Sequence, residues 1–125
     1  MRYHKSIFGI LTYCLVMNDK QARSVRDKYN LSSCAITNDE SSDAYAYYEP
    51  SAKLVVVRMM DVQLSLSEVI GLIVHEANHV KQFIMEAISE HNPSDEFESY
   101  TVQEITRNLT QDYFKSKGIK DRLIE

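Results

Sequence analysis

Hydrophobic positions near the start of the chain follow two different patterns. In Ile7–Met17 apolar side chains occupy both alternating sets of positions, which is typical of an interior strand, although a short buried helix would show the same pattern. The next residues, Lys20–Tyr29, are polar except at helical spacing, and Asn18 or Asp19 before them suits a helix N-cap. This part of the chain therefore predicts a buried strand followed by a surface helix.

The middle of the chain has the alternation and the residue types of two strands. Ala44–Tyr48 is rich in tyrosine and Lys53–Arg58 is rich in valine, and both residue types favour strands. The few residues between them include Pro50, which ends the first strand and suggests a hairpin. We therefore expect a small, mainly antiparallel sheet.

Two long helices are predicted in the second half of the chain. The first opens with Ser65 and Glu68 in the spacing of a capping box, is apolar on most sides and is expected to reach about Glu90. Asn92 and Pro93 interrupt it, because proline has no backbone N–H to donate.

The second helix is expected to begin at Pro93 or Ser94 and to continue to about Lys117, where Gly118 ends it. Together these elements predict an α+β fold, a small sheet packed on two long helices, in a single domain over residues 1–125.

Composition and charge narrow the function classes. The 125 residues are 44% hydrophobic and 26% charged with a net charge of -4, and no basic stripe is present. A nucleic-acid partner is therefore not expected. With two cysteines, Cys14 and Cys34, neither a disulfide scaffold nor a cysteine-rich metal site is indicated. Both are expected to be buried free thiols, and the alternative is a disulfide between them in an exported protein.

The N-terminal segment has the beginning of a signal peptide but not its end. Arg2 and Lys5 precede the apolar run, yet no small residues suited to cleavage follow it. The run is also too short to span a bilayer. We therefore expect a cytoplasmic protein without a membrane partner.

The sequence His75-Glu76-Ala77-Asn78-His79 lies in the middle of the first long helix. Histidines four residues apart project from one face of a helix, so both imidazoles can bind one metal ion. A carboxylate between them can reach a water on that ion without being a ligand, which is the arrangement of a zinc hydrolase. Zinc is therefore the expected cofactor, with His75 and His79 as ligands and Glu76 as general base.

A catalytic zinc site needs a third protein ligand. The metzincin pattern would have a glycine and a third histidine where this chain has Gln82 and Met85, so that class is excluded. His91 lies too far along the helix to fold back easily.

The opening of the second long helix offers three carboxylates instead, Asp95, Glu96 and Glu98. Here the chain resembles the gluzincin peptidases, whose second helix donates a glutamate ligand from the pattern Glu-x-x-x-Asp or Glu-x-x-Ala-Asp. The matching segment is Glu96-Phe97-Glu98-Ser99-Tyr100, and residues 74–103 also look like short metallopeptidases of bacteriophages and prophages.

The resemblance implies a minimal zincin-like fold in which Glu96 is the third zinc ligand. Tyr100 replaces the acidic residue that supports a zinc-binding histidine in that family, and its hydroxyl could take the same role. A donor to the oxyanion is also expected, from Tyr47, Tyr48 or Tyr100.

The resulting prediction is a zinc-dependent peptidase that acts on a peptide or protein substrate, which by fold analogy pairs with an open edge of the hairpin. One alternative is a zinc-binding protein without catalysis, or a phage-encoded protein that regulates a host partner in the host-cell cytoplasm. A second alternative is a metal-free helical module that binds a partner. The sequence does not indicate the oligomeric state.

Overall fold

The computed structural model describes residues 1–32, 42–60 and 63–122. Its sheet has four strands in the order β1 (Tyr3–Lys5), β2 (Thr12–Val16), β4 (Leu54–Met59) and β3 (Ala44–Glu49). The outer pairs, β1 with β2 and β3 with β4, are antiparallel, whereas the central pair of β2 and β4 is parallel. The mainly antiparallel sheet was predicted correctly, but its parallel centre was not.

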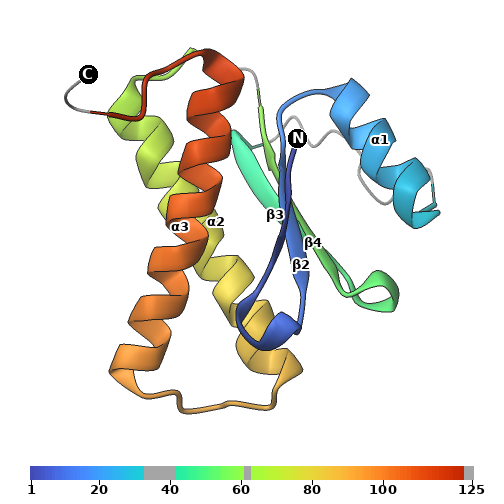
Figure 1. Ribbon diagram of the computed structural model, residues 1–125, viewed down its shortest axis with the longest axis vertical. Helices are drawn as coiled ribbons and strands as arrows, with labels where there is room; N and C mark the ends of the chain where they lie inside the picture. Colours follow the sequence, from blue (N-terminus) through green and yellow to red (C-terminus); the bar gives the residue numbers. More distant parts are fainter. Residues whose placement is uncertain (33–41, 61–62, 123–125) are drawn as a thin grey trace.

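Helices cover both faces of this sheet (Figure 1). α1 (Asp19–Tyr29) packs on one face, and α2 (Leu66–Ala87) and α3 (Asp95–Lys117) lie side by side on the other. A strand presents alternate side chains to opposite faces, so β2 and β4 supply both layers of the core. The α+β fold with two long helices on a small sheet is confirmed.

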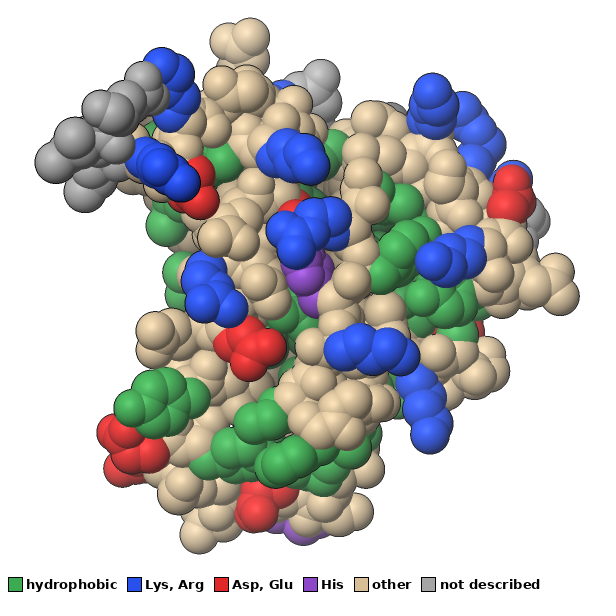
Figure 2. Space-filling model, in the orientation of Figure 1, with side chains coloured by type: hydrophobic (Ala, Val, Ile, Leu, Met, Phe, Trp, Pro, Cys, Tyr) green, Lys and Arg blue, Asp and Glu red, His purple; other side chains and the backbone are tan. Residues whose placement is uncertain are grey.

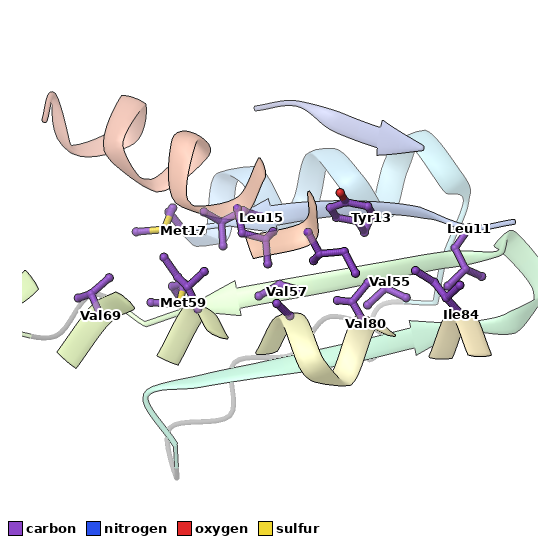
Figure 3. Close-up of a cluster of buried hydrophobic side chains, with 14 residues drawn as sticks. Leu11, Tyr13, Leu15, Met17, Val55, Val57, Met59, Val69, Val80 and Ile84 are labelled. Carbon is purple, nitrogen blue, oxygen red and sulfur yellow. The ribbon is translucent and has the colours of Figure 1, made fainter. Parts of the chain in front are cut away.

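The larger core lies between the sheet and the two long helices. Figure 3 shows side chains of β2 and β4 pointing toward those of α2. The labelled members of this layer are Leu11, Tyr13, Leu15, Met17, Val55, Val57, Met59, Val69, Val80 and Ile84. The intervening residues of the same strands, such as Cys14 and Val56, pack against α1.

Local signals set the ends of the helices. Ser65 and Glu68 form the predicted capping box at the start of α2, and the Ser94 hydroxyl accepts a hydrogen bond from the backbone N–H of Phe97 at the start of α3. Gly118, with φ of 68°, ends α3 in the left-handed conformation that glycine adopts without strain. α2 ends at Ala87, earlier than predicted.

The segment predicted as one strand over Ile7–Met17 is two elements. Residues Ile7–Gly9 form a 3-10 turn, η1, and the strand begins only at Thr12. Phe8 and Gly9 have φ values of 59° and 62°, and these left-handed residues reverse the chain so that β1 pairs with β2. Hydrophobic periodicity carries no signal for a left-handed phenylalanine, so the turn was missed.

A buried polar network ties β1 and β2 to α3. The His4 Nε2 and Asp112 Oδ2 atoms are 2.7 Å apart, and Asn108 donates a hydrogen bond of 2.7 Å to the Tyr13 hydroxyl. Each of these polar groups has a partner inside the protein, so burying them is not penalised by a lost hydrogen bond.

Cys14 is buried and not in a disulfide, as predicted, whereas Cys34 lies outside the described residues. Burial raises the pKa of the Cys14 thiol to about 12. Of the helices in the described residues, none combines the length and the apolar character that crossing a bilayer requires.

Candidate metal centre

Two imidazoles meet on the middle of α2. The Nε2 atoms of His75 and His79 are 3.1 Å apart, and the ring centroids are 4.8 Å apart at an interplanar angle of 74°. Residues four apart on a helix are neighbours on its surface, which explains why the sequence spacing alone brings the rings together.

The separation of these two nitrogens matches what a single ion requires. Tetrahedral coordination with metal–nitrogen bonds of about 2.1 Å places two ligand nitrogens about 3.4 Å apart. The observed 3.1 Å between the Nε2 atoms of His75 and His79 differs from that by a small rotation of either ring. The two histidines can therefore bind one metal ion without a change in the helix.

A glutamine holds the ring of His79. The His79 Nδ1 atom lies 3.0 Å from Gln82 Oε1, one turn further along α2. Because the glutamine oxygen only accepts, Nδ1 carries the proton in this contact, and the Nε2 lone pair of a neutral His79 faces His75 Nε2, 3.1 Å away, where an ion bound by both nitrogens would replace that hydrogen bond. The sequence prediction missed this role of Gln82, although its position three residues after His79 could have indicated it.

The carboxylate of Glu76 is buried beside the two rings. Glu76 is 2% exposed, and its Oε1 atom lies 3.9 Å from the His75 Nε2 atom. Within the described residues its Oε2 atom has no hydrogen-bond partner. A buried carboxylate oxygen without a partner is costly, and a water or other donor at this position would satisfy it.

Burial also changes the acidity of this group. Desolvation raises the pKa of the Glu76 carboxyl above its ordinary value, and the charges of the nearby His79 and His75 oppose that effect only in part. The ligand atoms of His75, Glu76 and His79 all lie within 4.8 Å of one another. In residues 1–32, 42–60 and 63–122, no further group of three or more such side chains is close enough to hold an ion.

The structure does not bring Glu96 into this group. Glu96 is exposed in the first turn of α3, and it is not among the residues whose ligand atoms cluster. The other carboxylates considered in that turn, Asp95 and Glu98, are outside the cluster too, as is His91.

The rotation of α2 explains this separation. Lys81 Nζ lies 2.6 Å from Glu98 Oε1, so α3 packs along the side of α2 that carries Lys81. At about 100° per residue, Lys81 and His79 point about 160° apart on the helix. His79 therefore faces away from the side on which Lys81 meets α3, and His75 points about 120° from Lys81. A cavity of about 570 Å³ between the two helices, lined by residues that include Asn78 and Glu98, likewise has neither histidine in its lining.

The three candidate tyrosines lie in different places. Tyr100 is on α3 and is 64% exposed, and Tyr47 donates a hydrogen bond of 3.0 Å to Glu49 on the face of the sheet that α1 covers. Tyr48 faces α2, and its ring stacks on Phe83 with centroids 5.0 Å apart. Phe83 is one turn beyond His79, so of the three tyrosines Tyr48 packs on the part of α2 that carries the metal group.

An edge of the sheet runs next to this part of α2. β3 packs against α2 through Tyr48 and, within the described residues, pairs with β4 alone.

Comparisons with protein-family models, with curated proteins and with solved structures found no match.

Proposed function

We propose that this protein is a zinc-dependent peptidase in which His75 and His79 bind the metal and Glu76 is the general base. The observation that carries the proposal is the unpartnered Oε2 of Glu76, buried beside two imidazoles whose Nε2 atoms are 3.1 Å apart. Neutral imidazoles and carboxylates are ligands and bases that suit zinc.

Zinc in this position would lower the pKa of a bound water to about 7 and polarise the carbonyl of the scissile bond. Glu76 accepts the proton of the attacking water at Oε2 and then delivers it to the leaving amine. A carboxyl whose pKa is raised by burial is a stronger base than an exposed one, which suits transfer near neutral pH.

The exposure of the histidines supports a catalytic rather than a structural site. Structural zinc sites fill all four positions with protein ligands and are closed to solvent. Here the His75 side chain is 67% exposed, and the described cluster supplies two imidazoles, which leaves positions on an ion for a third ligand, a water and a substrate carbonyl.

A peptide substrate is supported by the position of β3. An extended peptide can add to the open edge of a sheet through backbone hydrogen bonds. Because β3 packs on the helix that carries the metal group and, among the described strands, is at the edge of the sheet, a peptide added to it would lie along that helix.

The decisive experiment compares Glu76→Gln with the unchanged protein. Zinc content after dialysis is measured by mass spectrometry, and hydrolysis is measured on a library of fluorescence-quenched peptides. We expect about one zinc per chain in both proteins, and hydrolysis only with Glu76 present. Zinc binding without any hydrolysis by the unchanged protein would contradict the peptidase and favour a silent zinc-binding protein, and no zinc binding would contradict both.

A separate variant tests the third ligand. Glu96→Gln is expected to change zinc affinity by less than about threefold, because the Glu96 carboxylate is outside the cluster of ligand atoms. Glu98→Gln is the matched control, since Glu98 already pairs with Lys81. A loss of tenfold or more in Glu96→Gln alone would restore Glu96 as the ligand implied by the family resemblance.

A further inference from the structure

The turn before β2 presents a phenylalanine to solvent on a strained backbone. Phe8 is 75% exposed and has φ of 59° and ψ of 9°, a left-handed conformation that disfavours any residue with a side chain. Glycine would fit this backbone better. The ring therefore contributes little to the fold that would offset the strain, and backbone strain of this kind is typical of functional positions.

Phe8 is part of a larger aromatic surface. Its ring lies 6.2 Å, centroid to centroid, from that of Phe97 in the first turn of α3, and Tyr100 follows three residues later on the same side of that helix. Tyr100 is also largely exposed. We call Phe8, Phe97 and Tyr100 the aromatic patch. Exposed apolar groups that gather in this way mark interaction sites, whereas single ones are ordinary.

Acidic side chains border the aromatic patch. Glu96 and Glu104 lie one helical turn before and after Tyr100. A hollow of about 220 Å³ beside Tyr100 has one acidic side chain, Glu104, and one basic side chain, Arg107, in its lining. Figure 2 shows hydrophobic side chains over the lower part of this face, bordered by Asp and Glu, with the Lys and Arg side chains above them or to the right.

We propose that the aromatic patch is a docking surface for a segment of another protein that presents an apolar side chain between lysines or arginines. A basic amphipathic helix has this chemistry. The apolar side chain would pack on Phe8 and Phe97, and the cations would pair with Glu96 and Glu104. A second copy of this chain is disfavoured, because it would place the same acidic border against itself and the chain carries a net charge of -4.

This surface is distinct from the metal centre. The aromatic patch belongs to η1 and α3, whereas the cluster of His75, Glu76 and His79 belongs to α2. The proposal therefore does not depend on zinc or on hydrolysis, and it is tested in the presence of EDTA so that the probe is not cleaved.

The probe is a fluorescein-labelled amphipathic peptide built from leucine and lysine, and the matched control peptide has glutamate in place of every lysine. Binding to the full-length protein is followed by fluorescence anisotropy. We expect the lysine peptide to bind at least tenfold more tightly than the glutamate peptide, with an affinity that falls as salt is added.

Phe8→Gly separates docking from folding. It removes the ring and relieves the left-handed strain, so we expect at least tenfold weaker peptide binding without a lower unfolding temperature. Glu96→Gln combined with Glu104→Gln is expected to reduce the preference for the lysine peptide. Leu66→Ser is the matched control, because Leu66 is an exposed apolar residue on the first turn of α2, outside the aromatic patch.

Three results would overturn the docking proposal: no binding of the lysine peptide, equal binding of both peptides, or unchanged binding in Phe8→Gly. Self-association that depends on Phe8, measured by sedimentation, would also overturn it, because the occupant would then be a second copy of the chain.

Discussion

Histidine meets a carboxylate in two regions of this protein, with opposite outcomes. His4 is buried and the Asp112 side chain is only 10% exposed; the two lie 2.7 Å apart, although 108 residues separate them in the sequence. His75 and Glu76 are neighbours in the chain, yet their closest nitrogen and oxygen are 3.9 Å apart, with the imidazole exposed and the carboxylate buried. The first pair is satisfied within the protein, and the second is not.

The two pairs therefore have different roles in the protein. A pair whose groups bond each other inside the protein does not need an outside partner, and its contact holds β1 to α3. An imidazole that is open to solvent beside a carboxylate oxygen without a partner can bind something from outside. The same residue types therefore stabilise the fold in one region and are available for a metal in the other.

The largest effect on stability is expected at the pair of His4 and Asp112. His4→Ala leaves the Asp112 carboxylate buried without its partner, and breaking a buried pair in this way costs about 3–5 kcal/mol. Urea unfolding followed by circular dichroism measures this loss, with the exposed His91→Ala as the control. Zinc affinity should be unchanged. A destabilisation below about 1 kcal/mol would show that the pair does not hold the fold together.

The next largest effect is expected on zinc affinity, at the cluster of His75, Glu76 and His79. His79→Ala removes one of two imidazole ligands, so zinc affinity should fall by at least about 100-fold, which corresponds to about 2.7 kcal/mol. Competition with a chromophoric chelator measures it. The free energy of unfolding of the metal-free protein should change little, because His79 lies on the surface side of α2. If His91→Ala lowered zinc affinity as much, the site would be elsewhere.

Glu76→Gln tests whether burying the ionised carboxylate of Glu76 destabilises the folded protein. Burial raises its pKa in the folded protein above the value in the unfolded chain, so ionisation opposes folding. The contribution of this group to stability is thus largest below the unfolded pKa of about 4.3 and is lost as pH rises through the folded pKa. In EDTA, Glu76→Gln should therefore be more stable than the unchanged protein at neutral pH, because its neutral side chain avoids the cost of burying a charge.

The same comparison at low pH is the control for this variant. Below about pH 4 the carboxyl is protonated in both states, and the difference between Glu76→Gln and the unchanged protein should disappear. If Glu76→Gln were less stable than the unchanged protein at neutral pH, the ionised carboxylate would have hydrogen-bond partners. That would contradict the structure, in which the Glu76 Oε2 atom has no partner among the described residues.

The smallest effect concerns the orientation of the imidazole. Gln82→Ala removes the acceptor for His79 Nδ1, and losing such a supporting contact reduces metal affinity by about 10- to 100-fold, with the lower value expected for this exposed pair. Gln103→Ala on α3 is the matched control. Equal affinities for the two variants would show that Gln82 does not hold the ring.

Features set by neighbouring residues were predictable from the sequence. The capping box of Ser65 and Glu68, the strands of the hairpin and the pairing of His75 with His79 all depend on local spacing. Their physical causes act within one helical turn or between two adjacent strands, so a short window of sequence contains them.

Features set by packing between distant segments were not predictable. The contact between His4 and Asp112 joins the two ends of the chain, and neither residue has a local signal for it. The position of Glu96 depends on how α2 is rotated against α3, and the contact of Lys81 with Glu98 shows that rotation. Spacing along the chain does not determine that rotation, so the predicted third ligand was not found in the cluster.

The most direct test of the metal centre uses the four histidines of the chain. Nitrogen-15 NMR of the imidazoles, recorded before and after one equivalent of zinc is added, distinguishes the ring nitrogens of each histidine. We expect the Nε2 resonances of His75 and His79 to shift together while those of His4 and His91 stay unchanged. If neither His75 nor His79 shifted, or if His91 shifted with only one of them, the metal site on α2 would be contradicted.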